Sequence, residues 1–217
     1  MSKIYILSPK QYAGAENLPV IVFDYFDKEI DLSPYDALIF TSKNGVLALE
    51  EINPLWRSKE IYSIGSGTTR AVKALGGNVV YEARSSYGDN FAEEIKTHLA
   101  GKKVLFLRPK VVTSHLNTIL RDAGVDLDEE VIYETKCNDC EKLHIPEKGS
   151  YIIFSSPSTI ECFFKCFTWD ESYTAIVIGE KTASYMPEAI SFVMSPKQTI
   201  DACIAVAEQK SNISSKN

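Results

Sequence analysis

Apolar and polar residues along the chain group into short buried runs, each followed by an amphipathic segment. Residues 37–41, ALIFT, are apolar enough for a strand that is buried on both faces. After the polar turn at Ser42, the residues Val46, Leu49 and Ile52 recur at helical spacing. A buried strand, a turn and an amphipathic helix make up the repeating unit of a parallel α/β sheet. The pattern therefore predicts an α/β fold.

This pattern occurs twice. Residues 150–164, SYIIFSSPSTIECFF, align with residues 36–50 at an offset of 114 residues. The same offset places Ile64-Gly65 on Ile178-Gly179 and Thr68 on Thr182. A register that is shared over such a span without a gap indicates a duplicated unit.

A second echo has an offset of 100 residues. It relates residues 3–10, KIYILSPK, to residues 103–110, KVLFLRPK. The first copy stands at the N-terminus, whereas its counterpart comes at the end of the first full repeat. We therefore expect the strand at 3–8 to cross over and complete the C-terminal domain.

The remaining elements follow from the same patterns. In the central part we expect strands at 37–41, 60–64, 78–82 and 103–107 and helices at 44–52, 66–76, 89–100 and 112–123. In the C-terminal part we expect strands at 151–155, 173–178 and 191–194 and helices at 157–167, 180–187 and 198–209.

These elements predict two similar parallel-sheet α/β domains with an active-site cleft between them. One domain is discontinuous and combines residues 1–17 with residues 138–217, and the other spans residues 27–128. Segments 18–26 and 129–137 are rich in β-branched and aromatic residues, which favour strands. We expect these two segments to join the domains as a two-stranded antiparallel connection.

Composition narrows the function classes. The net charge of −6 argues against a nucleic-acid binder, which needs a basic face. No apolar run approaches the length that spans a bilayer, and the N-terminus has no convincing signal peptide. We expect a cytoplasmic protein without a membrane or nucleic-acid partner.

The five cysteines include the spacings Cys137-x-x-Cys140 and Cys162-x-x-x-Cys166. Two such pairs are compatible with zinc. However, Cys162 and Cys166 lie among phenylalanines in a predicted helix, where cysteine behaves as a small hydrophobic residue. The odd number of cysteines also favours reduced thiols, so we expect free thiols and no metal.

Glycine-rich turns give no nucleotide motif. Gly65-Ser66-Gly67 follows a predicted strand, but Arg70 occupies the place of the third glycine. We therefore expect no nucleotide cofactor. Ser42, Thr68, Ser156 and Thr182 all lie at strand-to-helix turns, where they can cap helices or line a ligand site at the strand ends. The two interpretations are compatible.

Several short motifs occur in order over nearly the whole sequence: residues 39–46 (IFTSKNGV), 64–68 (IGSGT), 107–109 (LRP), 131–135 (VIYET), 154–158 (FSSPS), 178–183 (IGEKTA) and 195–196 (SP). In their order and spacing the chain resembles the uroporphyrinogen-III synthase family. The family fold has two α/β domains that are joined by a two-stranded ladder. The sequence departs from the family between Lys10 and Leu18, where a helix is almost deleted, and at Pro109, where the family often has glycine.

The resemblance implies a cyclising lyase without metal or organic cofactor. Such an enzyme closes hydroxymethylbilane, a linear tetrapyrrole, to uroporphyrinogen III with loss of water and inversion of ring D. It implies a monomer with Tyr133 as the group that assists departure of the substrate hydroxyl. Substrate carboxylates would bind at Ser42, Gly65, Thr68, Arg108, Ser155, Ser156, Gly179 and Thr182.

Two alternatives remain open at this point. Tyr133 could be an ordinary aromatic residue on a connecting strand. The chain as a whole could be a non-catalytic two-lobed protein that binds a small anion. A binder would leave the isomer ratio of cyclised hydroxymethylbilane unchanged, whereas a synthase would shift it from isomer I to isomer III.

Overall fold

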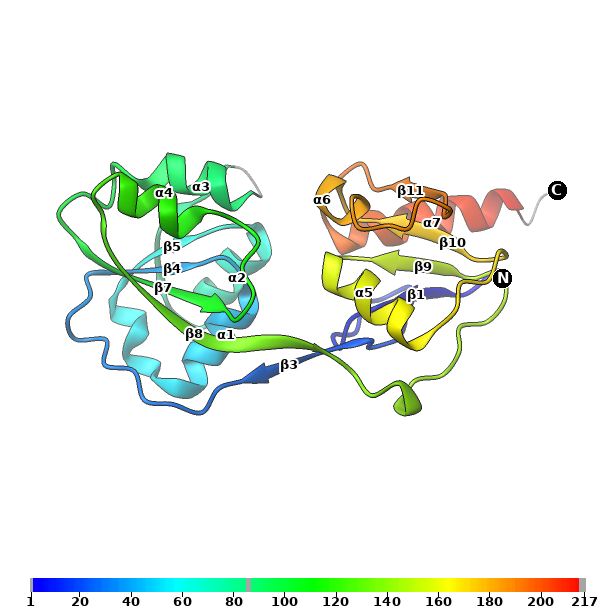
Figure 1. Cartoon of the computed structure of the whole chain (residues 1–217), viewed down its shortest axis with the longest axis horizontal. Helices are drawn as coiled ribbons and strands as arrows, with labels where there is room; N and C mark the ends of the chain where they lie inside the picture. Colours follow the sequence, from blue (N-terminus) through cyan, green and yellow to red (C-terminus); the bar gives the residue numbers. More distant parts are fainter. Residues whose placement is uncertain (1, 85–86, 215–217) are drawn as a thin grey trace. The chain divides into compact units, whose positions relative to one another are not determined.

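The computed structural model describes residues 2–84 and 87–214 of the chain (Figure 1). It divides into two compact units. Unit 1 combines residues 1–22 with residues 135–217, and unit 2 comprises residues 23–134. The α/β fold class with parallel sheets is confirmed.

Unit 2 contains a six-stranded sheet in the order β3-β8-β7-β4-β5-β6. Its strands are β3 (Ile21–Tyr25), β4 (Ala37–Phe40), β5 (Glu60–Ser63), β6 (Asn78–Glu82), β7 (Lys103–Pro109) and β8 (Asp126–Cys137). Its helices are α1 (Lys43–Ile52), α2 (Ser66–Ala74), α3 (Gly88–Ile95) and α4 (Leu116–Asp122), with a 3₁₀ turn at Pro54–Ser58. The pairs from β8 through β6 are parallel.

The edge strand β3 runs antiparallel to β8. The amide of Phe26 donates to the carbonyl of Ile132, and the amide of Asn138 donates to the carbonyl of Val20. From the first bonded pair to the second, the residue number falls from 26 to 20 in one segment and rises from 132 to 138 in the other, so the two strands run in opposite directions. Both strands continue past the division between the units, so the chain crosses it twice.

Alternation along β4 explains why this strand is apolar throughout. Ala37 and Ile39 belong to a core that Phe91 of α3 and Leu120 of α4 also enter. Leu38 and Phe40 point the other way, into a core that includes Val46, Leu49 and Val72 of α1 and α2. Successive side chains of a strand point to opposite faces, so a central strand between two helix layers must be apolar at every position.

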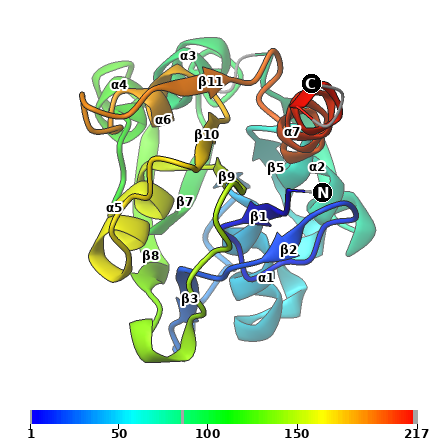
Figure 2. The ribbon, with the colours of Figure 1, turned by 90° about the vertical axis from the view of Figure 1, so that its right-hand side faces the viewer.

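Unit 1 contains a five-stranded sheet in the order β11-β10-β9-β1-β2 (Figure 2). Its strands are β1 (Ile4–Ile6), β2 (Glu16–Asn17), β9 (Tyr151–Phe154), β10 (Thr174–Val177) and β11 (Phe192–Met194). Its helices are α5 (Pro157–Cys166), α6 (Glu180–Ala183) and α7 (Ile200–Ser214), with a 3₁₀ turn at Cys140–Lys142. The first strand pairs with β9, in the C-terminal sheet that the offset of 100 residues predicted for it.

The connection from β1 to β2 contains no helix, although these strands are parallel neighbours. The side-chain amide of Asn17 stabilises the loop that joins the two strands. Its Nδ2 donates to the carbonyl of Ser8 at 2.7 Å and to that of Lys10 at 2.8 Å. A loop therefore replaces the helix that is almost deleted between Lys10 and Leu18, and the Asn17 side chain fixes this loop by bonding to two of its backbone carbonyls.

Helix α6 is much shorter than the predicted helix at 180–187. It ends at Ala183, and the amides of Tyr185 and Met186 then bond three residues back, to Thr182 and Ala183. Pro187 has no amide hydrogen and cannot continue the helix. The tighter turn before this proline explains the difference.

The expectation of reduced thiols was wrong for four cysteines. Cys137 is bonded to Cys162 and Cys140 to Cys166, with a Cα separation of 5.1 Å in both pairs. Cys162 and Cys166 lie one turn apart on α5, so both can face the Cys137–Cys140 segment. Linear spacing does not show which segments meet in space, and the hydrophobic context of α5 was misleading. Cys203 is a buried free thiol.

Candidate functional site

Three of the predicted binding residues of unit 2 lie at one edge of its sheet. Strand β4 is flanked by β5 and β7, and all three run parallel. Ser42 follows β4, Gly65 follows β5, and Arg108 is the next-to-last residue of β7. The carboxyl ends of parallel strands are the usual ligand-binding edge of an open α/β sheet. The structure therefore brings these three residues to one edge.

Ser42 is the N-cap of α1. Its backbone is extended and its Oγ accepts a hydrogen bond from the amide of Asn44 at 3.2 Å. The first amides of a helix have no partner within the helix, and they carry the positive end of its dipole. The start of α1 can therefore bind an anion beside the Ser42 hydroxyl.

Tyr133 lies on β8 opposite Pro109, and its carbonyl accepts from the amide of Lys110 at 2.9 Å. Only 3% of the residue is exposed, and its ring meets those of Phe23 and Tyr25 edge-on. Burial raises the pKa of the Tyr133 phenol, while a side-chain hydrogen bond with Ser42 opposes this shift. The phenol therefore stays protonated at neutral pH and lies next to the cap of α1.

Gly45 is a residue of this region that the sequence analysis missed. A Cβ atom at this position would lie 3.3 Å from Cδ1 of Phe40, 3.4 Å from the carbonyl oxygen of Leu107 and 3.7 Å from Cε1 of Tyr133. Glycine thus allows α1 to approach β7 and the Tyr133 ring closely. A glycine inside a predicted helix, which costs about 1 kcal/mol relative to alanine, was the available signal.

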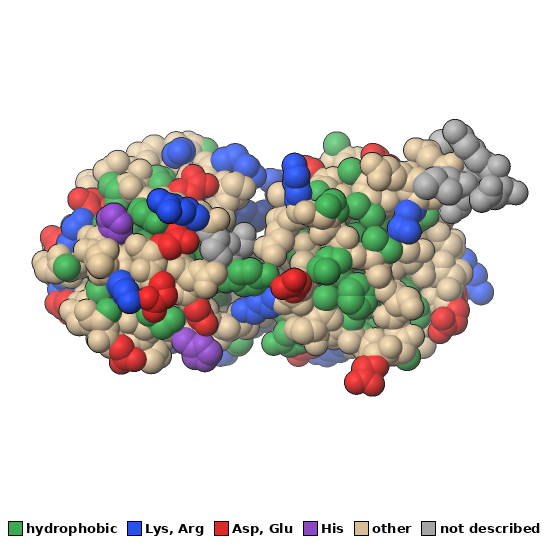
Figure 3. Space-filling view, turned by 90° about the horizontal axis from the view of Figure 1, so that it is seen from above, with side chains coloured by type: hydrophobic (Ala, Val, Ile, Leu, Met, Phe, Trp, Pro, Cys, Tyr) green, Lys and Arg blue, Asp and Glu red, His purple; other side chains and the backbone are tan. Residues whose placement is uncertain are grey.

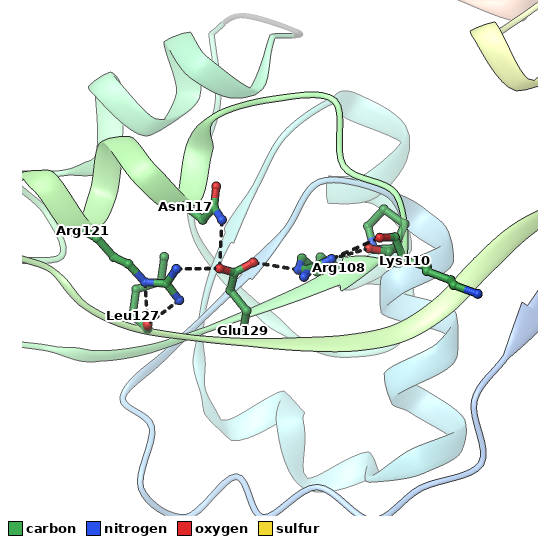
Figure 4. A network of polar contacts seen from close by, with 7 residues as sticks. Arg108, Lys110, Asn117, Arg121, Leu127 and Glu129 are labelled. Atoms are coloured by element: carbon green, nitrogen blue, oxygen red, sulfur yellow. Dashed lines mark hydrogen bonds and ion pairs between the residues drawn. The ribbon is translucent and has the colours of Figure 1, made fainter.

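Arg108 is engaged by an acidic partner within unit 2 (Figure 4). Its Nε lies 2.7 Å from Oε2 of Glu129, and its Nη1 donates to the carbonyl of Pro109 at 3.0 Å. Glu129 also pairs with Arg121 at 2.8 Å and accepts from Asn117 at 2.9 Å. Glu129 therefore compensates much of the Arg108 charge, and the network fixes the end of β7.

The turn after β5 is built by Gly65, which has a φ of 83° and caps α2 without a side chain. Its carbonyl accepts from the amides of Thr68 at 2.9 Å and Thr69 at 3.1 Å. Thr68 is only 5% exposed, so its side chain belongs to the packing of the helix start. Arg70, by contrast, is exposed in the same helix and makes no ion pair within the described part of the chain.

Unit 1 repeats this arrangement at the ends of β9 and β10, which are parallel neighbours. Ser155 and Ser156 follow β9, and Ser156 caps α5. The Ser156 Oγ accepts from the amide of Thr159 at 3.4 Å, and Oγ1 of Thr159 accepts from the amide of Ser156 at 3.2 Å. This reciprocal pair is a capping box.

Gly179 follows β10 and precedes α6 with an extended backbone. A Cβ atom here would lie 2.9 Å from Nε2 of Gln198, so the Gln198 side chain covers this turn. Thr182 is 4% exposed, and its amide donates to the carbonyl of Gly179 at 3.0 Å. The sequence analysis did not identify Gln198, which lies on an exposed segment without a pattern of its own.

Charges on the surface of unit 2 are mixed. Figure 3 shows basic and acidic side chains interspersed on this face of the unit. Lys110 is paired with Glu134 at 3.0 Å, as Arg108 is with Glu129. The described residues on this face of unit 2 therefore offer no broad basic surface, and local donors at the helix starts are the groups there that could attract an anion.

Within residues 2–84 and 87–214, no set of three or more histidine, cysteine, aspartate or glutamate side chains could hold a metal ion. In the same part of the chain, every helix is too short or too polar to cross a bilayer.

The family model described as uroporphyrinogen-III synthase HemD matches residues 14–205. The chain belongs to the uroporphyrinogen-III synthase family. These enzymes are cyclising lyases of tetrapyrrole biosynthesis. Comparison with curated proteins gives no match.

Solved structures agree with this assignment. The chain is similar to uroporphyrinogen-III synthetase from Helicobacter pylori 26695, with 31% identity and a TM-score of 0.82, over 97% of this chain and 100% of that one. A mutant uroporphyrinogen III synthase from the extremely thermophilic bacterium Thermus thermophilus matches over 100% of both chains with a TM-score of 0.61. Its identity is 11%, so it supports the fold alone.

Proposed function

We propose that this chain closes hydroxymethylbilane to uroporphyrinogen III, with loss of water and inversion of ring D. The observation that carries the proposal is the position of the Tyr133 phenol. It is buried, it keeps its proton at neutral pH, and it lies close enough to the Ser42 side chain at a helix start for Ser42 to oppose the rise of its pKa. A proton donor thus lies beside a position suited to a substrate carboxylate.

Tyr133 is proposed to protonate the hydroxyl group of the substrate as it leaves. The carbon–oxygen bond breaks, water departs, and the hydroxymethyl carbon then bonds to the substituted α-carbon of ring D. The methylene carbon that linked this position to ring C must leave it and bond to the unsubstituted α-carbon of ring D, which inverts the ring. Loss of the hydrogen at that carbon restores the pyrrole, so the proton that Tyr133 donates is returned. The Ser42 hydroxyl orients the phenol during this exchange.

The eight carboxylates of the substrate are proposed to bind at the helix starts of each unit. Ser42 and Ser156 cap helices of ten residues, whose dipoles place partial positive charge at these starts, and the cap hydroxyls can turn to an incoming carboxylate. Gly65, Ser155 and Gly179 shape the adjoining turns. Thr68 and Thr182 are proposed to stabilise these turns by packing beneath them in the protein interior, because their side chains are buried.

Arg108 is proposed to position the end of β7 rather than to bind a substrate carboxylate strongly. Its ion pair with Glu129 and its bond to the Pro109 carbonyl leave it a positioning role at the end of β7. Arg70 is the better candidate for a direct carboxylate contact, because it is exposed and unpaired within the described residues.

Selectivity is proposed to come from holding one folded conformation of the linear substrate. Hydroxymethylbilane cyclises unaided to the isomer without inversion, so the enzyme must favour one contact over a nearby alternative. Loss of water and formation of a carbon–carbon bond leave the overall oxidation state unchanged. We therefore propose that the reaction needs no redox cofactor and no metal.

We further propose that the chain acts as a monomer in the cytoplasm, with the linear tetrapyrrole as its partner. The net charge of −6 and the mixed surface of unit 2 disfavour a nucleic-acid partner.

An isomer-resolved assay tests the proposed function. Freshly made hydroxymethylbilane is mixed with the purified chain, and the products are separated as isomers I and III. We expect isomer III to dominate at catalytic amounts of protein. If the isomer ratio equals that of the protein-free reaction, the chain is a binding protein instead.

A further inference from the structure

Four cysteines form a cluster that the proposed reaction does not use. Cys137 is the last residue of β8, and Cys140 begins the 3₁₀ turn that follows. Cys162 and Cys166 lie one turn apart on α5. The two pairs are bonded as Cys137–Cys162 and Cys140–Cys166, and all four residues belong to unit 1.

We propose that these four cysteines are a reversible thiol–disulfide site, whose reaction partners are small disulfides and dithiols. For each pair, two thiols lose two protons and two electrons and become one disulfide. The incoming disulfide takes up these electrons and protons and leaves as two thiols. The reverse reaction consumes one dithiol and returns the pair of cysteines to thiols.

The arrangement in α5 supports two independent exchanges. Each pair has a Cα separation of 5.1 Å, within the usual range for a disulfide, so neither pair needs a large backbone movement to open or close. Cys137 is partly exposed but its partner Cys162 is only 3% exposed, whereas Cys140 and Cys166 are both partly exposed. Thiol–disulfide exchange needs access to a sulfur atom. The Cys140–Cys166 bond should therefore open first.

The two disulfides join a short segment at the end of β8 to helix α5. They tie the segment from Cys137 to Cys140 to both ends of the second half of α5, across sequence separations of 25 and 26 residues. The segment's other contacts include the end of β8, the bonds of Asn138 to the carbonyls of Pro19 and Val20, and short-range bonds of Asp139 around the 3₁₀ turn. Oxidation therefore stabilises a segment that has few other contacts, because it limits the unfolded chain.

The start of α5 does not depend on these bonds. Ser156 and Thr159 form their capping box at the opposite end of the helix from Cys166. Reduction should therefore loosen residues 137–140 and the end of α5 while the helix start persists. The prediction is a change in thermal stability without loss of the fold.

The test uses the full-length chain. It is fully reduced without oxygen, then exposed to glutathione disulfide, and free thiols are alkylated at intervals and located by peptide mass spectrometry. We expect the pairs 137–162 and 140–166 to form. On titration with dithiothreitol, Cys140 and Cys166 should become alkylated before Cys137 and Cys162. Full reduction should lower Tm by about 5–10 °C.

Variants separate the site from general effects of oxidation. A Cys140→Ser/Cys166→Ser chain should keep the 137–162 bond and show a smaller redox-dependent change in Tm. Cys203→Ser is the matched control, because Cys203 is a buried thiol outside the cluster, and it should leave the redox response intact.

Three results would overturn the proposal. The four cysteines could remain thiols in the folded chain under glutathione disulfide. They could form other pairs or bonds between chains. The reduced chain could also bind zinc stoichiometrically through these cysteines, which elemental analysis would detect and which would make the cluster a metal site.

Discussion

Gly45 shows how a single residue sets the distance between α1 and Tyr133, which we propose as the proton donor. A methyl group there would press on the Leu107 carbonyl, which cannot move without the strand, and on the Phe40 ring. Glycine in a helix normally costs stability relative to alanine. The close approach therefore offsets a propensity that would favour alanine at this position.

This balance predicts opposite results for two helical glycines. Gly67→Ala, in α2, should raise the free energy of unfolding by about 0.5 kcal/mol, because a Cβ atom there meets nothing within 4 Å. Gly45→Ala should gain nothing, because its Cβ atom would lie 3.3 Å from the Phe40 ring, which must shift to admit it, and turnover should fall if this shift reaches the neighbouring Tyr133 ring. Urea unfolding and initial rates check this. Equal stabilisation of both variants would show that α1 does not need the glycine.

The negative charge of Glu129 stabilises the end of β7 through its ion pairs with two arginines. Glu129→Gln removes a carboxylate that pairs with both Arg108 and Arg121 and whose side chain is 13% exposed. We expect a loss of about 1–3 kcal/mol of unfolding free energy, because two guanidinium groups lose their partner. Glu93→Gln is the control. Its pair with Lys96 is exposed, so its loss should stay under about 0.5 kcal/mol. A Glu129→Gln chain as stable as the control would refute this role.

The Tyr133 phenol also links stability to pH. Because burial raises its pKa, the folded chain keeps this proton at pH values where the unfolded chain has lost it. Its contribution is therefore complete below about pH 10 and is lost as the pH rises further. Between pH 8 and 11, the unfolding free energy should fall more steeply for the native chain than for Tyr133→Phe. Parallel curves would mean that the phenol is solvated in the folded state.

The capping turns show what repetition predicts at the scale of elements. The offset of 114 residues placed Ser42 and Ser156 in equivalent turns, and both cap a helix. The sequence could predict this because caps depend on local residue types. It could not predict that Tyr133 meets Ser42, because that contact depends on how β8 pairs with β7, including a register shift next to Pro109.

Loss of the capping box should weaken unit 1 measurably. Ser156→Ala removes the acceptor for the Thr159 amide, and we expect a loss of about 1 kcal/mol in unfolding free energy. Ser158→Ala, in the first turn of the same helix, is the matched control and should change stability by less than half as much. Thermal unfolding of the two variants checks this. Equal losses would mean that the box does not stabilise α5.

The disulfides mark the limit of prediction at the element scale. Four cysteines allow three pairings, and their spacing and hydrophobic context favoured free thiols over zinc. The actual pairing depends on which face of α5 meets residues 137–140. Helical periodicity predicts that Cys162 and Cys166 share one face of the helix. It does not predict which segment packs against that face.

At the scale of the whole molecule, the α/β class followed from strand-and-helix patterns, and the family followed from ordered motifs that are each weak alone. The same scale explains the lack of obvious catalytic clusters in the sequence. If the main task is to hold one conformation of a reactive substrate, the donors are backbone amides and hydroxyls spread over both units. Such donors leave little trace in residue types.

We propose that proton donation and selection of the isomer are separate tasks of this enzyme. Tyr133→Phe keeps the aromatic ring and removes only the phenol hydroxyl. With the variant in excess over hydroxymethylbilane, we expect the rate of ring closure to fall by about 10²-fold while the product remains isomer III. An unchanged rate would contradict the role of Tyr133 as the proton donor, and a switch to isomer I would contradict the separation of the two tasks.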